Sequence, residues 1–419
     1  MIFYYLLVSI MPMMRHPLWS QLMGELTGIK YVGVICLGYA LAYILARSTP
    51  VRFFETWQAR WFVLFCFLGM ASYATMAVPQ PLEISPFMSY LSFLLFFFVT
   101  LVLVDSLERF RFTLLVAIGS VGYSSLHLLR EWQKYGGMSA GYRPGWVTGD
   151  PNYYSISALL CLPLALYLLR TKQPQWERWF CVSSIVLTLL GLTLAASRGA
   201  LIGLAVASLL SVARSQQLGR NFLILFVVLI PLMTFAPSSP LSRLLSPDRS
   251  DQESTDRRIA LWETGLRMVQ AHPLTGIGTG NFKPLSRNYG NFAEDVGVAH
   301  NTYMEVAAEL GIPGLMLFGA ILFSTAQTLA RVRRATRDSG PALIYHASEA
   351  IQVGLVGALT AIFFVSAEYQ KLLWLMVFLT MCLPAIAADA TSEFTSPAPL
   401  NDRTAFSFDP TSPVSRWRS

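Results

Sequence analysis

A histidine beside a predicted helix start is the feature of this sequence best suited to proton transfer. The segment reads Ala299-His300-Asn301-Thr302-Tyr303-Met304-Glu305, and it leads through Gly311 into an apolar run. Histidine is the side chain whose ordinary pKa lies closest to neutrality, so it can take up a proton at physiological pH. Thr302 and Glu305 have the spacing of a capping box, which predicts a helix that begins here and ends at Gly311. The amides at the start of that helix would favour an anion beside His300.

Two arginines supply groups that bind anions. Arg198 lies between two apolar runs, and Arg258 is followed four residues later by Trp262. A guanidinium forms paired hydrogen bonds with phosphate oxygens, so both residues are candidates for holding an anionic ligand. Arg198 also has a simpler reading, because an arginine at a short turn can reach the water beside the membrane. His300 likewise has a simpler reading, as a polar residue beside a helix cap.

A glycine-rich stretch, His272-Pro273-Leu274-Thr275-Gly276-Ile277-Gly278-Thr279-Gly280-Asn281-Phe282, lies between these residues. It follows a helical pattern at about 257–270 and no strand precedes it, so it does not predict a dinucleotide-binding loop. We expect a tight turn that approaches a ligand or packs against a span, with His272 in a structural role. The preceding helix should be capped within 254–256 and should carry one apolar face.

The composition places these residues in a membrane protein. Of the 419 residues, 54% are hydrophobic and 13% are charged, which excludes an ordinary water-soluble domain of this length. A helix needs about 20 residues to cross a bilayer, and in lipid it satisfies its own backbone hydrogen bonds. The sequence therefore predicts an all-α polytopic membrane protein with about twelve transmembrane helices. The predicted spans are residues 2–14, 29–46, 61–79, 86–104, 110–129, 152–169, 177–196, 199–213, 221–236, 312–330, 346–366 and 371–388.

Positive charges orient these spans. With a cytoplasmic N-terminus, most arginines of the short loops fall on the inner side, and the one long loop falls on the outer side. The net charge of +7 is spread over many loops, so the sequence does not predict nucleic-acid binding. The basic residues assigned to inner loops are Arg47, Arg52, Arg60, Arg109, Arg111, Arg170, Lys172, Arg178, Arg214, Arg220, Arg331, Arg333, Arg334 and Arg337.

The chain divides into four predicted parts. Residues 1–236 hold nine spans, residues 237–311 form the outer loop with amphipathic helices and the candidate site, and residues 312–388 hold three more spans. Residues 389–419 are rich in Ser, Thr, Pro and Asp and predict a disordered cytoplasmic tail. We expect no metal site, because the five cysteines lie within predicted spans without paired spacing and the acidic residues of the loop lack the spacing of an EF-hand.

Four motifs occur in an order that resembles a known family. Gly149-Asp150-Pro151-Asn152 opens a span, and Ser197-Arg198-Gly199-Ala200-Leu201-Ile202-Gly203 lies at a junction between spans. Arg258-x-x-x-Trp262 leads to the glycine-rich stretch, and His300-Asn301-Thr302-Tyr303 precedes the last spans. With the long loop on the outer face, this order resembles the bacterial O-antigen ligase and polymerase superfamily, and most of all its O-antigen ligases. The resemblance covers about residues 145–330.

The resemblance implies an inverting glycosyltransferase of the Gram-negative inner membrane, with both termini cytoplasmic. Such ligases act in lipopolysaccharide biosynthesis: they transfer O-antigen polysaccharide from undecaprenyl pyrophosphate to the lipid A core oligosaccharide at the periplasmic face. The family is thought to work without a metal, and no cofactor is expected. It implies His300 as the catalytic base and Arg198 and Arg258 as the pyrophosphate-binding residues. The candidate accessory residues are Arg257, Arg267, Asp150 and Asn301.

Two other functions fit parts of this pattern. A sister enzyme on the same scaffold would polymerise the glycan or attach it to a protein, and the sequence does not reveal which acceptor the loops would admit. A transporter of lipid-linked glycan would carry charged residues inside its spans. The central predicted spans are nearly free of charge, and only Glu368 and Lys371, near a loop, favour that function.

Overall fold

The computed structural model describes residues 1–13, 28–47, 51, 53–76, 78, 85–136, 142–145, 148–214, 249–290, 297–338 and 340–395. Every regular element in these residues is a helix, as the composition predicts. The helices are α1 (Ile2–Ile10), α3 (Gly28–Ala46), α4 (Trp57–Met76), α5 (Pro86–Leu103), α6 (Leu107–Tyr135), α7 (Pro151–Leu168), α8 (Gln175–Ala195), α9 (Arg198–Arg214), α12 (Arg249–Ala271), α13 (Phe282–Tyr289), α14 (Thr302–Thr336), α15 (Ala342–Ala361), the 3₁₀ helix η2 (Ile362–Phe364) and α16 (Lys371–Thr395).

Seven of the described helices are long and apolar enough to cross a bilayer: α4, α5, α6, α8, α14, α15 with η2, and α16. The apolar part of α3, Tyr31–Ala46, is shorter than these. The chain is therefore a multi-pass helical membrane protein. The count of twelve spans remains a prediction, and the span predicted at 221–236 lies outside the described residues.

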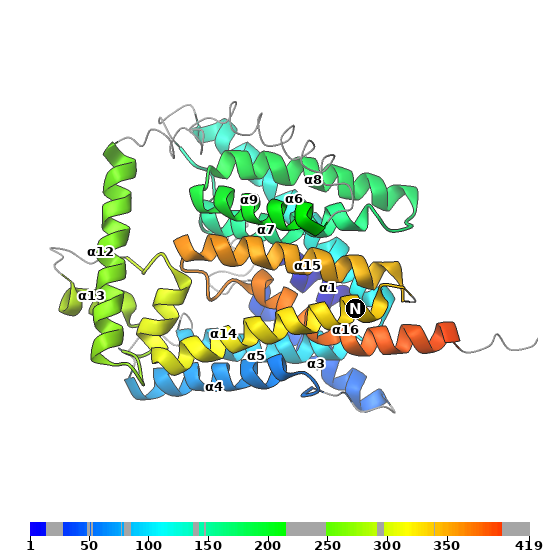
Figure 1. The fold of residues 1–419 in the computed structure, drawn as a ribbon, viewed down its shortest axis with the longest axis horizontal. Coiled ribbons are helices and arrows are strands. Elements are labelled where there is room, and N and C mark those ends of the chain that lie inside the picture. Colours follow the sequence, from blue (N-terminus) through cyan, green and yellow to red (C-terminus); the bar gives the residue numbers. More distant parts are fainter. Residues whose placement is uncertain are drawn as a thin grey trace, which may run out of the picture.

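The long helices lie side by side, with α15 in the middle of the bundle (Figure 1). On one side α15 packs along α7 and α9, and α7 in turn contacts α6 and α8. On the other side α14 packs along α4 and contacts α15 and α16. Here the buried Trp374 ring lies 5.1 Å from the ring of Phe62, 5.8 Å from Phe93 and 6.1 Å from Phe318. Helix α12 lies crosswise over one end of the bundle, where it contacts α13 and α14 (Figure 1).

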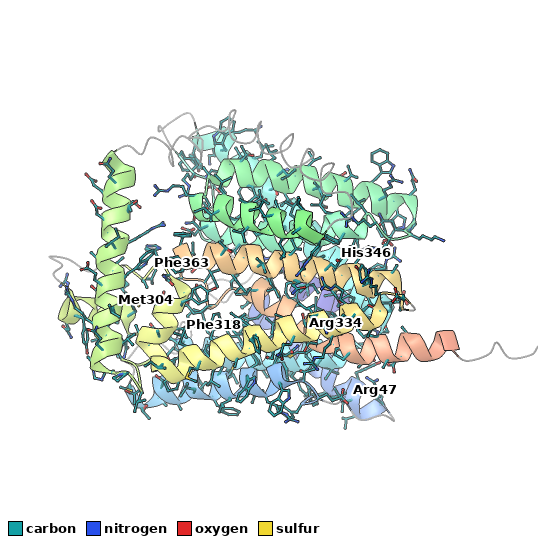
Figure 2. The ribbon with its side chains drawn as sticks, viewed as in Figure 1. Arg47, Met304, Phe318, Arg334, His346 and Phe363 are labelled. Atoms are coloured by element: carbon teal, nitrogen blue, oxygen red, sulfur yellow. The ribbon has the colours of Figure 1, made fainter. Side chains whose placement is uncertain are left out.

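One end of the bundle gathers basic residues of alternate connections, and we call it the basic end. Asp105 accepts hydrogen bonds from Arg47 at 3.1 Å and from Arg109 at 2.9 Å, and Arg111 pairs with Glu177. The ends of α3 and α5 and the starts of α6 and α8 therefore share this end, as the alternation of charged loops predicts. The opposite end carries α12 and His300, and we call it the His300 end. Figure 2 labels Arg47, Arg334 and His346 toward the basic end and Met304 and Phe363 toward the other.

Three predicted boundaries are wrong. Helix α12 begins at Arg249 and not near 257, so the residues expected to cap it, Ser254, Thr255 and Asp256, lie inside the helix. Such residues cost a helix interior only a few tenths of a kcal/mol each, too little to stop it. Helix α16 continues to Thr395, so the predicted tail at 389–419 begins as helix, and residues 396–419 lie outside the described part. Helix α1 ends at Ile10, short of the predicted span 2–14.

The N-cap of helix α14 differs from the predicted residue, whereas the interruption predicted at Gly311 is present. Asn301, and not Thr302, is the N-cap, and its side-chain oxygen accepts a hydrogen bond from the Met304 N–H at 3.1 Å. The predicted stop at Gly311 is a kink: Gly311 has φ 69° and ψ −174°, and the helix resumes beyond it to Thr336. The arm before the kink belongs to the His300 end, and the long arm after it runs to the basic end.

Candidate functional site

His300 lies in a short connection whose backbone is held on both sides. Its own φ is 49°, in the left-handed region that few non-glycine residues adopt. On one side, the indole N–H of Trp262 on α12 donates to the Ala299 carbonyl at 3.1 Å. On the other side, Asn301 caps α14. The strained conformation at His300 is thus fixed by neighbours from two helices, as is common at functional sites.

Thr302 ties this connection to a distant part of the chain. Its backbone N–H and its hydroxyl both donate to the Val365 carbonyl, at 3.1 and 2.7 Å. The hydroxyl in turn accepts a hydrogen bond from the Ala367 N–H at 2.9 Å. Thr302 is fully buried. The position of His300 therefore depends on residues 365–367, which connect η2 to α16.

Charged groups from two other elements act on the His300 imidazole. Burial lowers the pKa of His300 from its ordinary value, and the nearby positive charge of Arg258 lowers it further. The negative charge of Asp150 opposes this effect, and Arg257 contributes a weaker lowering of the pKa. The imidazole is therefore held neutral at neutral pH, which is the form that accepts a proton. Arg258 is half-buried and Arg257 is exposed, so the structure favours Arg258 of the two neighbouring arginines.

Arg198 is the first residue of α9, immediately after a tight turn. Helix α8 ends at Ala195, and Ala196 takes the left-handed conformation with φ 46° and ψ 43°. The buried hydroxyl of Ser197 then accepts a weak hydrogen bond from the Ala200 N–H at 3.4 Å. Arg198 thus lies at a helix N-terminus, where backbone amides and the helix dipole also favour an anion.

The turn before Arg198 is connected to the start of α7. The Ser197 hydroxyl donates to the side-chain oxygen of Asn152 at 2.8 Å, and Arg143 donates to the same oxygen at 3.1 Å. Arg143 also donates to the Ala195 carbonyl at 2.8 Å, which satisfies an end group of α8. Asp150 caps α7, because its carboxylate accepts the Asn152 N–H at 2.6 Å.

Aromatic side chains of η2 join the Arg198 turn to the His300 connection. The Phe363 ring lies 5.3 Å from the ring of Trp262 and 6.4 Å from that of Tyr303. The next residue, Phe364, packs so closely on Gly199 that a Cβ there would lie 3.1 Å from the Phe364 Cβ. Figure 2 labels Phe363 and Met304 near the crossing helix α12. The two arginine motifs and the histidine motif thus meet around η2, although they are far apart in the chain.

The glycine-rich stretch packs against spans, which is one of its two predicted roles. The N–H groups of Ile277 and Gly278 donate to the carbonyls of Ala308 and Glu309, at 2.9 and 3.1 Å. Gly276 has φ +66°, and a Cβ there would lie 2.2 Å from the Glu309 carbonyl oxygen. Only glycine fits this approach. The stretch therefore fixes the arm of α14 that follows His300.

Three buried carboxyl groups gather at this arm, two from the arm itself and one from the connection before α16, and the sequence pattern was not read as such a group. Glu305, Glu309 and Glu368 are 4%, 5% and 7% exposed, and their charges act on one another. Burial raises the pKa of Glu368 to about 7. One oxygen each of Glu305 and Glu368 and the Ser366 hydroxyl have no hydrogen-bond partner among the described residues. The i, i+4 spacing of Glu305 and Glu309 was the available signal, since it places both on one helix face.

Among the described residues, no group of three or more His, Cys, Asp or Glu side chains is placed to hold a metal ion. Protonation would stabilise the three buried carboxyl groups, because neighbouring buried carboxylates cannot all be ionised.

Two more residues singled out in the sequence lie at the lower part of the crossing helix α12 or just beyond its end. Arg267 donates to the Tyr289 carbonyl at 3.0 Å and lies 3.8 Å from the Glu263 carboxylate, so its contacts join α12 to α13. The His272 ring contacts the Tyr289 hydroxyl at 3.0 Å, in line with its expected structural role. Arg143 is the reverse case, since it contacts the turn before Arg198 but was not among the predicted site residues. Its position six residues before the Gly149-Asp150-Pro151-Asn152 motif was the available signal.

Comparison with known families agrees with the motifs. Residues 183–319 match the family model described as O-antigen ligase, which confirms the predicted resemblance. The match contains Arg198, Arg258, the glycine-rich stretch and His300, whereas Asp150 and η2 lie outside it. The comparison with curated proteins found no match.

Proposed function

Because the chain carries an O-antigen ligase domain over residues 183–319, we propose that it ligates O-antigen polysaccharide from undecaprenyl pyrophosphate onto the lipid A core. The observation that carries the proposal is the arrangement at His300, where a half-buried imidazole with a lowered pKa faces the positive charge of Arg258. A base beside a cation suits a reaction that removes a proton from an acceptor while a pyrophosphate leaves.

In this proposal His300 is the general base. Its unprotonated nitrogen takes the proton of the acceptor hydroxyl as that oxygen attacks the anomeric carbon of the donor glycan. The new C–O bond forms as the bond between the anomeric carbon and the pyrophosphate oxygen breaks, and the bonding pair leaves with the pyrophosphate. A single direct displacement inverts the anomeric configuration.

Arg198 and Arg258 are the proposed pyrophosphate-binding residues. The leaving group gains negative charge in the transition state, and fixed guanidinium groups stabilise that charge better than mobile water does. The N-terminus of α9 adds backbone amides beside Arg198. Asp150 and Arg257 tune the charge around the base, while Asn301 fixes its backbone as the cap of α14. Arg267 supports the site from α12, through its hydrogen bond to the Tyr289 carbonyl of α13.

The proposal includes a location. The His300 end would face the periplasm, the basic end would face the cytoplasm, and both termini would be cytoplasmic in a Gram-negative inner membrane. This orientation is supported by the arginines gathered at the basic end, because positive residues favour cytoplasmic loops. The donor would then reach His300 from the outer leaflet.

One observation favours a second function. The three buried carboxyl groups Glu305, Glu309 and Glu368 are the kind of feature that coupled transporters use to bind protons or cations. A transporter of the lipid-linked glycan is therefore an alternative, next to a polymerase or a protein oligosaccharyltransferase that would use the same chemistry on another acceptor.

The test is reconstituted transfer with purified protein. Undecaprenyl-pyrophosphate glycan is incubated with lipopolysaccharide that lacks O-antigen, with EDTA present, and the lipid A core is examined for added glycan. Parallel reactions offer free glycan acceptors or a protein acceptor in place of the core. We expect transfer to the core, reduced about 10²–10⁴-fold in His300→Gln, because that is the contribution of a positioned general base.

Each outcome has a distinct meaning. Transfer only to glycan or protein acceptors would replace the ligase with a sister enzyme. Full activity of His300→Gln would remove His300 as the base. No transfer to any acceptor, together with movement of lipid-linked glycan across vesicle membranes, would replace the enzyme with a transporter.

A further inference from the structure

A partly buried arginine at the basic end has an unsatisfied guanidinium. Arg214 is the last residue of α9, far along that helix from Arg198. Its Nη1 atom is buried and has no hydrogen-bond partner among the described residues. Burying a cationic nitrogen without a hydrogen-bond partner raises the free energy of the folded protein. The groups around Arg214 indicate what kind of ligand could accept its hydrogen bond.

The nearest charges do not balance Arg214. The guanidinium of Arg333 on α14 acts on it as a like charge, and Glu349 on α15 acts as the opposite charge. However, the Glu349 carboxylate is shared: it lies 3.9 Å from Arg333 and 3.7 Å from the His346 ring. It also accepts a hydrogen bond from the Tyr345 hydroxyl at 3.4 Å. Two guanidinium groups thus face one carboxylate that already has other partners.

Further polar groups surround this pair. A third guanidinium, that of Arg170, stacks on the Tyr167 ring at 4.7 Å. The Tyr167 ring in turn lies 6.4 Å from that of His346. The group therefore holds more positive than negative charge, which suits an anion.

The helices that carry Arg214 and Arg333 also have exposed apolar side chains. Leu209 of α9 is 57% exposed, and Phe323 of α14 is 66% exposed. In a membrane protein such side chains face acyl chains. The ends of spans lie at the level of lipid headgroups, and basic residues between helices at that level bind phosphate headgroups.

We propose that Arg214 and Arg333 bind a phosphate group between the ends of α9, α14 and α15, and that this phosphate is the headgroup of an anionic phospholipid. The bound phosphate would accept hydrogen bonds from the Arg214 guanidinium and would neutralise the repulsion between the two arginines. The lipid would thereby hold three helices together at the end opposite His300. This proposal does not depend on the proposed enzymatic function.

The experiment compares lipid retention by native mass spectrometry. Purified protein is incubated with phosphatidylglycerol or with phosphatidylcholine of the same acyl chains, and the bound lipid is counted after release from detergent. We expect tight retention of phosphatidylglycerol by the wild type and at least about a 10-fold loss of apparent affinity in Arg214→Gln and Arg333→Gln, since about 1.4 kcal/mol corresponds to that factor.

The matched control is Arg334→Gln. Arg334 is exposed on the same helix as Arg333, at the same end of the bundle, so the substitution removes an equal charge without touching Arg214 (Figure 2). We expect it to retain phosphatidylglycerol as the wild type does. Equal losses in Arg214→Gln and Arg334→Gln would overturn the proposal, because they would indicate general surface charge. So would equal retention of the two lipids by the wild type.

A second measurement separates the sources of phosphate and guards against misfolding. The midpoint of thermal unfolding is followed in phosphatidylcholine nanodiscs as inorganic phosphate is added. Stabilisation by phosphate alone, lost in Arg214→Gln, without retention of phosphatidylglycerol would support the phosphate site and overturn the lipid. Arg214→Lys keeps the positive charge but cannot form bidentate hydrogen bonds, so it should fold normally and retain an intermediate amount of lipid. Wild-type retention by this variant would overturn the role of paired hydrogen bonds.

Discussion

At the basic end, regular helix ends meet through ion pairs, as between Asp105 and its two arginines. At the His300 end, the backbone itself is irregular. Every residue with a positive φ among the described residues lies there, including the non-glycine residues Ala196 and His300. The kink at Gly311 and the turn at Gly276 belong to the same end.

The two ends are therefore held together in different ways, the basic end by ion pairs and the His300 end by backbone hydrogen bonds. Ion pairs between helix ends tolerate small shifts, because flexible side chains can adjust their reach. The connection around His300 is held more exactly, because its neighbour Ala299 accepts a hydrogen bond from Trp262 of α12 and Thr302 bonds to residues 365–367. Strained backbone conformations persist only where the surrounding structure fixes them. We expect substitutions at the two ends to have correspondingly different effects.

The largest difference in activity should come from removing one positive charge at either end of the bundle. Arg258→Gln and Arg198→Gln should each lower kcat/KM for glycan transfer about 10²–10³-fold, the usual loss when a group that stabilises transition-state charge is removed. Arg334→Gln at the basic end removes the same charge and should retain wild-type transfer. Initial rates of glycan transfer in the reconstituted assay measure this. Similar losses in all three variants would show that net charge, and not position, matters.

Next in size should be a contrast between two glycines. Gly276→Ala should lower the free energy of unfolding by at least about 2 kcal/mol, because the alanine must keep a positive φ and its Cβ meets the Glu309 carbonyl oxygen. Gly319→Ala, in the long arm of α14, meets no atom within 4 Å. It should be neutral or stabilising by about 0.5–1 kcal/mol. Thermal unfolding in detergent compares them, and a stable Gly276→Ala would contradict the tight packing of the glycine-rich stretch.

The hydroxyl of Thr302 should have a smaller effect on stability and a selective effect on catalysis. Thr302→Val removes the two hydrogen bonds that the hydroxyl makes with Val365 and Ala367, at a cost of about 1–3 kcal/mol. Since these bonds position His300 without touching substrate, kcat should fall while KM changes little. Thr302→Ser keeps the hydroxyl and should restore kcat. If valine and serine variants lose kcat equally, the methyl group and not the hydrogen bonds holds the connection.

The smallest effect should be a shift in pH dependence. The acid limb of kcat/KM should lie below about 6.5, the ordinary value for histidine, because burial and Arg258 lower the pKa of His300. Arg258→Gln removes a positive charge, so it should raise the His300 pKa and move the limb to higher pH. Asp150→Asn removes a negative charge and should move the limb to lower pH. Measuring kcat/KM of both variants as a function of pH tests these shifts. Shifts in the opposite directions would contradict the effects of Arg258 and Asp150 on the His300 pKa.

Much of the molecule could be predicted from local patterns. Apolar runs predict the helical membrane class, and the order of the motifs around Asp150, Arg198, Arg258 and His300 predicted the resemblance that the match over residues 183–319 confirms. Helix boundaries were harder, because polar residues such as Thr255 and Asp256 start some helices and lie inside others. A cap is decided by small differences in free energy that neighbouring elements easily outweigh.

The sequence by itself determined the helical membrane class of the protein, the candidate residues for its proposed chemistry and the loops that share an end. Those properties follow from residue type and short-range spacing, which can be read directly from the sequence. Only the tertiary structure decided that Arg258 acts on His300 more strongly than Arg257, and that Thr302 bonds to Val365. It also brought Glu305, Glu309 and Glu368 together. These contacts join segments far apart in the chain, and they depend on how helices pack and kink, which no local pattern specifies.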